Sequence, residues 1–178
     1  MLLVVDNGSS STKDIIDAVD SNGVDFESAQ YTKIGSNLDR FDSFILSGRR
    51  RRDYTTNVAN SRIIRHCVAQ EKPLLGICYG AEILALTMGG TLKVSSHRES
   101  IYDVAVSDLN PISYGTLSVF GKHRLEIARL PDTVLCLASS SACRYEMIQL
   151  QNSKIFGTQF HPELTHDGRM LMEQFLKL

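Results

Sequence analysis

The stretch Leu74-Leu75-Gly76-Ile77-Cys78-Tyr79-Gly80-Ala81-Glu82 is an apolar run that stops at a cysteine between two glycines and continues with a helical pattern. A strand that turns directly into a helix needs small residues two positions before and two after the turn, where Gly76 and Gly80 stand. The Cys78 side chain would then rise above the sheet at the amino end of the new helix, whose dipole and free N–H groups favour the reactive thiolate. The pattern therefore predicts a nucleophile at the end of a buried strand.

Strand and helix patterns alternate around this stretch, as expected of a parallel α/β sheet. Up to Gly90 the expected strands are Leu2–Asp6, Phe26–Tyr31, Ser43–Ser47 and Leu74–Cys78, and the expected helices are Thr12–Asn22, Asn57–Gln70 and Tyr79–Met88. Beyond Gly90 the expected strands are short and joined by turns: Thr91–Val94, Tyr102–Ser107, Leu117–Phe120, Val134–Ser139, Met147–Leu150 and Lys154–Phe160. A helix is expected over Asp167–Leu178. Without a linker signal, residues 1–178 are expected to form one domain with a strand-rich second half.

A second segment, Gly157-Thr158-Gln159-Phe160-His161-Pro162-Glu163, ends an apolar strand with an imidazole and a carboxylate. In an extended chain His161 and Glu163 project from the same face, and Pro162 between them indicates that the strand ends here. A carboxylate beside a histidine fixes the orientation and tautomer of the ring, which can then take a proton from a thiol. Because the carboxyl ends of parallel strands lie along one edge, we expect Cys78 and His161 to meet there. A buried structural cysteine and a surface histidine are the alternative interpretation.

Composition excludes several classes of protein. Lysine plus arginine number 19 and aspartate plus glutamate 20, so no overall charge attracts the chain to nucleic acid or to an anionic membrane. No apolar stretch approaches the roughly 20 residues of a membrane-spanning helix, and the apolar start is too short for a secretory signal. The cysteines show no C-x-x-C spacing for zinc or a redox pair, and Cys67, Cys136 and Cys143 are interpreted as structural. We expect a cytoplasmic protein with reduced thiols.

At these residues the chain resembles the class I glutamine amidotransferases, through Gly76-Ile77-Cys78-Tyr79-Gly80, Gln159-Phe160-His161-Pro162-Glu163, Asp6-Asn7-Gly8 and Ile45-Leu46-Ser47-Gly48. The resemblance covers nearly the whole chain. It implies a flavodoxin-like three-layer sandwich, with a central mostly parallel sheet and a small antiparallel strand-rich part in the second half. It also implies that Cys78, His161 and Glu163 form a catalytic triad, which releases ammonia from glutamine through a cysteinyl thioester. The substrate-binding residues that it implies are Gly48, Arg49, Tyr79, Glu82, Ser100 and Tyr102, with the N–H groups of Gly48 and Tyr79 facing the oxyanion.

Within that family the chain looks most like the glutaminase part of GMP synthase. The similar segments are Leu137–Cys143 with Glu146, Glu99–Tyr102, Lys122-His123 and His166. This resemblance implies that the substrate is glutamine and that the partner is a separate ATP-dependent synthetase, which aminates XMP to GMP. No cofactor or metal is expected in this chain, because ATP and Mg²⁺ would belong to the synthetase. Glutaminase components of anthranilate or aminodeoxychorismate synthase are the alternatives.

One departure from the family pattern lies after the third expected strand. The family generally has Ser-Gly-Gly-Pro there, in the loop that supplies an oxyanion N–H, whereas this chain has Ser47-Gly48-Arg49. If that position needs a positive φ angle, Arg49 costs roughly 1–2 kcal/mol, or the loop takes another shape. The run Arg49–Arg52 is interpreted as a solvated loop, or else as a site for an acidic partner surface or a phosphate.

The other departure is Glu82, at a position where the family generally has a substrate-contacting glutamine. One helical turn after Cys78, a carboxylate lacks the amide donor and is expected to raise the pKa of the thiol. Because of Arg49 and Glu82, a non-catalytic regulatory homologue is the second hypothesis. A stand-alone hydrolase of γ-glutamyl or peptide bonds is the third, and it is ranked last because short loops leave little to build a large cleft.

Overall fold

The computed structural model describes residues 1–50, 53–107 and 110–178, so Arg51 and Arg52 of the arginine run lie outside the described residues. The strands are β1 (Leu2–Asp6), β2 (Phe26–Gln30), β3 (Ser43–Leu46), β4 (Leu74–Ile77), β5 (Thr91–Val106), β6 (Thr116–Arg129), β7 (Val134–Ser139), β8 (Met147–Leu150) and β9 (Ile155–Thr158). The helices are α1 (Thr12–Ser21), α2 (Tyr54–Ala69), α3 (Tyr79–Thr87) and α4 (His166–Phe175), with the short 3-10 turns η1 (Tyr31–Lys33) and η2 (Pro162–Leu164).

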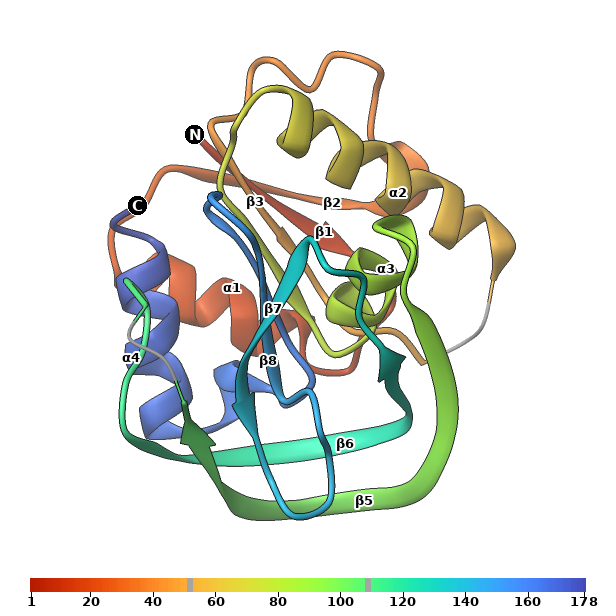
Figure 1. The fold of residues 1–178 in the computed structure, drawn as a ribbon. Helices are drawn as coiled ribbons and strands as arrows, with labels where there is room; N and C mark the ends of the chain where they lie inside the picture. The colour runs from red at the N-terminus through yellow and green to blue at the C-terminus, as the bar shows by residue number, and fades with distance from the viewer. Residues whose placement is uncertain (51–52, 108–109) are drawn as a thin grey trace.

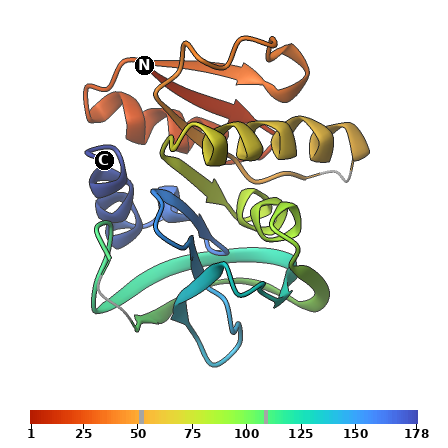
Figure 2. The ribbon, with the colours of Figure 1, turned by 45° about the horizontal axis from the view of Figure 1, so that its top comes forward.

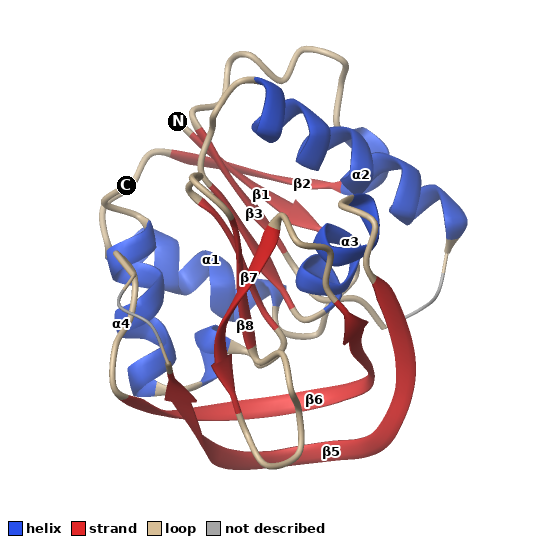
Figure 3. Cartoon of the chain, in the orientation of Figure 1, coloured by secondary structure: helices blue, strands red, loops and turns tan. Residues whose placement is uncertain are grey.

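These strands form one sheet in the order β2-β1-β3-β4-β9-β8-β7-β5-β6. Pairing is parallel from β2 through β9, and it is antiparallel from β9 through β6. Helices α1 and α4 cover one face of the parallel part, whereas α2 and α3 cover the other (Figures 1 and 3). The expected α/β fold, parallel first and antiparallel in the second half, is confirmed.

Each face of the parallel part is a row of apolar side chains in register. The row that faces α1 and α4 contains Val4, Ile45, Leu75 and Phe156, and the row that faces α2 and α3 contains Leu3, Phe44, Leu74 and Ile155. All of these residues are buried. A strand covered on both faces has no solvated side, which is why these strands have continuous apolar sequences without alternation.

The strand-rich second half is built on a long hairpin of β5 and β6 that crosses the lower half of the view in Figure 2. The sequence predicted two short strands within β5 and a short one within β6, and this prediction is wrong. Polar residues separate the two apolar segments of β5 and are typical of a loop. In the structure they continue the strand, with a shift in register between Val94 and Arg98. Pairing with β6 satisfies the backbone, so this stretch needs no local apolar pattern.

Two helix starts depend on side-chain caps. Helix α2 begins at Tyr54 rather than Asn57, because Asp53 caps it by accepting a hydrogen bond from the Thr55 N–H at 2.9 Å. Helix α4 begins after Thr165, whose hydroxyl accepts from the Gly168 N–H at 3.2 Å. None of the helices in residues 1–50, 53–107 and 110–178 is long and apolar enough to cross a bilayer.

Gly76 and Gly80 allow close packing where β4 turns into α3. A Cβ atom on Gly76 would lie 2.5 Å from the carbonyl carbon of Gly80, and one on Gly80 would lie 2.5 Å from the carbonyl oxygen of Leu46. Backbone atoms cannot rotate away as a flexible side chain can. We therefore expect Gly76→Ala to lower the free energy of unfolding by about 2–3 kcal/mol, measured by urea denaturation.

The matched control is Gly35→Ala, because a Cβ atom there has open space and Gly35 has no positive φ angle. This variant is expected to change the free energy of unfolding by less than about 0.5 kcal/mol. Equal losses in the two variants would contradict the packing argument.

Candidate active site

The carboxyl ends of four parallel strands meet at one edge of the sheet. They are Asp6 of β1, Leu46 of β3, Ile77 of β4 and Thr158 of β9. The chain leaves these ends into the loops and turns that carry the candidate residues Gly48, Cys78 and His161. Ligands of open α/β sheets bind at this edge.

Cys78 occupies the strand-to-helix turn that the sequence predicts. Its φ and ψ angles are 52° and −103°, a combination that residues with a side chain rarely adopt. The turn is fixed because the Cys78 N–H donates to the Thr158 carbonyl at 2.7 Å and the Cys78 carbonyl accepts from the Glu82 N–H at 3.0 Å. The sulfur is thereby held at the amino end of α3, and Cys78 is 8% exposed.

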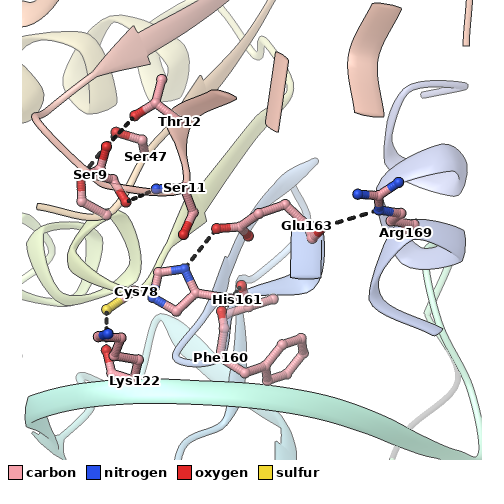
Figure 4. A network of polar contacts seen from close by, with 12 residues as sticks. Ser9, Ser11, Thr12, Ser47, Cys78, Lys122, Phe160, His161, Glu163 and Arg169 are labelled. Carbon is pink, nitrogen blue, oxygen red and sulfur yellow. Dashed lines mark hydrogen bonds and ion pairs between the residues drawn. The ribbon is translucent and has the colours of Figure 1, made fainter. Parts of the chain in front are cut away.

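His161 and Glu163 are in direct contact: Nδ1 of the ring lies 2.7 Å from Oε1 of the carboxylate, and both residues are buried (Figure 4). Their contact does not arise from an extended chain, as the sequence analysis assumed. His161 is extended, but Glu163 lies in η2, which begins at Pro162 and folds the carboxylate back toward the ring. The pair is anchored because the His161 N–H donates to the Phe120 carbonyl at 2.8 Å and Arg169 Nε donates to the Glu163 carbonyl at 3.0 Å.

The thiol and the imidazole form a coupled pair. The side chains of Cys78 and His161 interact closely enough for His161 to lower the pKa of the thiol, and the thiol donates to the Lys122 carbonyl oxygen at 3.8 Å (Figure 4). Burial raises the pKa of the Cys78 thiol; His161 opposes this shift, and the carboxylates of Glu82 and Glu163 add to it. Burial also lowers the pKa of His161, but Cys78 and Glu163 outweigh it and raise that pKa to about 10. The thiolate therefore forms as His161 becomes an imidazolium, whose charge Glu163 stabilises.

A cavity of about 450 Å³ opens over this pair. Its lining consists of Ser9, Ser10, Ser11, Arg49, Arg50, Cys78, Tyr79, Glu82, Lys122, His123, Arg124, Leu125, His161 and Leu164. This volume is typical of sites for small molecules. Among the described residues of the lining, lysine and arginine outnumber carboxylates four to one, so the cavity favours ligands that carry a carboxylate or another anionic group.

Three of the substrate-binding residues implied by the resemblance line this cavity, and a fourth lies next to Cys78 and His161. Arg49, Tyr79 and Glu82 line the cavity. Gly48 borders Cys78 and His161, because a Cβ atom on it would lie 3.3 Å from Cε1 of His161 and 3.7 Å from Cβ of Cys78. Helix α3 begins at Tyr79, and the first N–H groups of a helix have no partner within it. Gly48 therefore lies beside Cys78, and the free N–H of Tyr79 directly follows it in the chain.

Ser100 and Tyr102 are not among the residues that line the cavity. Ser100 lies opposite Gly121 in the hairpin and is exposed. The Tyr102 ring packs over Gly121, and its hydroxyl donates to Glu146 Oε2 at 2.9 Å. The Tyr102 side chain therefore connects β5 of the hairpin to Glu146, just before β8.

The loop after β3 reaches the site without backbone strain. Neither Gly48 nor Arg49 has a positive φ angle, so the loop has another shape, as the sequence analysis allowed, and Arg49 carries no penalty. A buried polar network holds the loop. Asn7 donates from its backbone to Ser47 Oγ at 2.9 Å and from its side chain to the Ser47 carbonyl at 3.0 Å, and Asn60 of α2 donates to Asn7 Oδ1 at 2.7 Å. The β1 and β3 loops are thus fixed to each other next to Cys78.

Several cavity residues were missed by the sequence analysis. The loop 9–11 follows β1, and the position of a Ser-rich turn after a parallel strand was a signal that could have placed it at this edge. Lys122, Arg124 and Leu125 reach the cavity from β6. Lys122 was noted only within a segment similar to the family, and the place of these residues at the cavity depends on the path of the long hairpin.

Glu82 is buried and accepts a hydrogen bond from Gln159 Nε2 at 3.3 Å. Its carboxylate is one of the groups that raise the pKa of Cys78.

Glu82→Gln keeps an acceptor for Gln159 but removes the charge, so the pKa of Cys78 falls. We expect alkylation of Cys78 by iodoacetamide to become about three- to tenfold faster at neutral pH, with its pH profile moved to lower pH. Glu173→Gln, at a more exposed carboxylate on α4, is the control, and an unchanged or slower rate in Glu82→Gln would contradict this role.

Comparison with known proteins shows which family the chain is similar to. The sequence profile of the family described as "Glutamine amidotransferase class-I" matches residues 3–178. GMP synthase [glutamine-hydrolyzing] from Histophilus somni is 31% identical over 98% of this chain, and the same-named protein from Yersinia enterocolitica is 27% identical over 98%. The chain spans 36% of the length of each of these two relatives.

Solved structures of other proteins have the same fold as this chain. A Thermoplasma acidophilum protein described as one subunit of a GMP synthase has a TM-score of 0.88 at 28% identity, covering 99% of this chain and 92% of that one. PurLQS from Thermotoga maritima has a TM-score of 0.78 at 20% identity, covering 99% of this chain and 97% of that one, a likeness of fold alone. Because the family profile runs from residue 3 to residue 178 and leaves almost none of the chain outside it, this protein belongs to the class-I glutamine amidotransferases.

Proposed function

We propose that this chain hydrolyses glutamine to glutamate and delivers the ammonia to a separate ATP-dependent synthetase subunit, which aminates XMP to GMP. The contact of Cys78 with His161, backed by Glu163 beneath a cavity of small-molecule size, carries this proposal. The GMP synthase relatives support XMP as the acceptor. The Thermoplasma acidophilum protein, similar over 92% of its length, supports a separate synthetase chain. The ATP and Mg²⁺ requirement would belong to the synthetase, and both proteins would meet in the cytoplasm.

In the proposed first half-reaction, the sulfur of Cys78, whose proton has already passed to His161, attacks the side-chain carbonyl carbon of glutamine. The N–H groups of Gly48 and Tyr79 receive the negative charge that develops on the carbonyl oxygen. His161 then returns the proton to the leaving nitrogen, the C–N bond breaks, and ammonia departs. A cysteinyl thioester remains on Cys78.

In the second half-reaction, water attacks the thioester and gives a proton to His161. The C–S bond breaks, the sulfur takes that proton, and glutamate is released. Glu163 accepts the Nδ1–H of His161 throughout, which fixes the tautomer and stabilises the imidazolium in both steps. The net reaction converts glutamine and water into glutamate and ammonia and regenerates the thiol.

A non-catalytic regulatory homologue is the second candidate, and one observation favours it: the carboxylate of Glu82 raises the pKa of Cys78. Under this alternative the chain binds its synthetase but releases no ammonia, even when the synthetase is supplied with all its substrates.

The experiment combines this chain with an ATP-dependent XMP-aminating synthetase, ATP, Mg²⁺, XMP and glutamine labelled with ¹⁵N at the amide. We expect ¹⁵N-labelled GMP and an equal amount of glutamate. Glutamate without labelled GMP would contradict the acceptor, and no glutamate at all would favour the regulatory alternative. In the control, Cys78→Ala with free ammonia still yields GMP, which shows that the synthetase is intact.

A further inference from the structure

Arg49, the residue that departs from the family pattern, is fixed by three contacts at the edge of the cavity. Its guanidinium carbon lies 3.8 Å from the centre of the Tyr79 ring, and Nη1 donates to Asn57 Oδ1 at 2.8 Å. The Tyr79 hydroxyl donates to the same Asn57 oxygen at 2.9 Å. Arg49 Nη1 also approaches the carbonyl of Asp53, the cap of α2, at 3.4 Å. One arginine thus joins the β3 loop to the first turns of α2 and α3.

These contacts form a closed unit, which we call the Arg49 clamp: Arg49, Asn57 and Tyr79. A carboxamide oxygen has two lone pairs, and here the guanidinium and the phenol occupy both. Burial raises the pKa of Tyr79, so the phenol stays protonated and remains a donor. A cation over an aromatic face adds attraction that grows as the site loses water. Arg49 is only partly buried, but its guanidinium has these fixed partners on the protein.

The position of the clamp connects it to the reaction. Arg49 directly follows Gly48, and Tyr79 directly follows Cys78. The two backbone segments that would receive the oxyanion are therefore held together by the side chains of neighbouring residues. Their mutual distance decides whether both N–H groups can reach one oxygen atom, and a displacement of about 1 Å can cost about 100-fold in rate.

We propose that Arg49 is a positioning residue, which through Asn57 and Tyr79 sets the spacing of the two oxyanion donors, and that it is not a ligand of glutamine. This inference rests on the proposed glutaminase activity. In this chain the arginine side chain connects the β3 loop to α3. The family's second glycine cannot make this connection, because glycine has no side chain. The replacement of glycine by arginine is then compatible with catalysis.

The test is steady-state glutamine hydrolysis by the chain with its synthetase, for the wild type, Arg49→Ala, Arg49→Lys and Asn57→Ala. For Arg49→Ala we expect kcat to fall about 10- to 100-fold while KM stays within about threefold, because the lost interaction acts in the transition state. Arg49→Lys keeps the charge over the ring but not the planar fork, so it is expected to recover part of kcat. Arg49→Ala combined with Asn57→Ala should cost little more than Arg49→Ala alone, since the residues act as a unit.

The matched control is Arg40→Ala. Arg40 also stacks on an aromatic ring, 4.4 Å from the centre of Phe41, and pairs with Glu27, but it is not among the residues that line the active-site cavity. Its kcat is expected to be unchanged. An increase in KM at constant kcat for Arg49→Ala would make Arg49 a glutamine ligand and overturn the proposal, as would unchanged kinetics. A wild-type chain that hydrolyses no glutamine with its synthetase would instead refute the proposed function, and the positioning role with it.

Discussion

Cys78→Ser is expected to abolish glutamine hydrolysis, with kcat falling by at least about 10⁴-fold. The hydroxyl has nearly the shape of the thiol, so the strained turn and the contact with His161 are kept. An alcohol is a far weaker acid than a thiol, and His161 cannot generate enough alkoxide for attack. The measurement is glutamate release in a coupled assay, with the melting temperature as a check on folding.

The control is Cys136→Ser. Cys136 lies on β7, partly exposed, and its thiol donates to the Ala138 carbonyl at 3.5 Å and the Arg144 carbonyl at 3.4 Å. A hydroxyl can make the same contacts, so activity is expected to stay within about twofold. If Cys78→Ser still hydrolysed glutamine, Cys78 would not be the nucleophile.

Glu163→Gln is expected to lower kcat by about 10²- to 10⁴-fold. An amide that turns its NH₂ group toward His161 imposes the wrong tautomer. An amide that turns its oxygen toward the ring keeps the hydrogen bond but buries the NH₂ group where Oε2, within the described part of the chain, has no partner. In both orientations the negative charge that stabilises the imidazolium is lost.

A second measurement follows from the same change. Glu163 is one of the two residues that raise the pKa of His161 to about 10, so its replacement should move that pKa down, as read by NMR titration of the labelled ring. Glu173→Gln, at a more exposed carboxylate paired with Lys177, should leave both kcat and this pKa unchanged. A His161 pKa that is the same in Glu163→Gln as in the wild type would contradict the orienting role of Glu163.

The parallel half of the fold could be predicted because each of its elements is marked by the residues of its own segment. Strands such as β1 and β4 are buried on both faces, and their continuous apolar runs mark them directly. The elbow at Cys78 is marked by Gly76 and Gly80, whose lack of side chains the packing requires. Helix α2 was placed three residues late because its cap, Asp53, stands beside the arginine run.

The hairpin β5–β6 could not be predicted in the same way. Its middle is polar, and the pairing partner lies far along the chain, as in the pair Glu99 and Lys122. Pairing across the hairpin, rather than a hydrophobic period, decides that this stretch is a strand. Because the hairpin brings Lys122 and Arg124 to the cavity, the basic side of the site was missed together with the strand.

The contact between His161 and Glu163 was expected for the wrong geometric reason. Their separation of two positions suggested one face of an extended chain, but the turn at Pro162 makes the contact. The Arg49 clamp could not be predicted from the sequence either, because Arg49, Asn57 and Tyr79 lie in three separate segments of the chain. Local patterns located Cys78, His161 and Glu163, whereas the side chains around them depend on tertiary packing.

The central claim is that the sulfur of Cys78, activated by His161, attacks a glutamine-like carbonyl group. The most direct test is peptide mass spectrometry of the wild-type chain after reaction with a diazoketone analogue of glutamine, with and without excess glutamine. We predict a single adduct on Cys78, which glutamine suppresses and which His161→Ala greatly slows. An adduct on another cysteine while Cys78 stays unmodified would contradict the account.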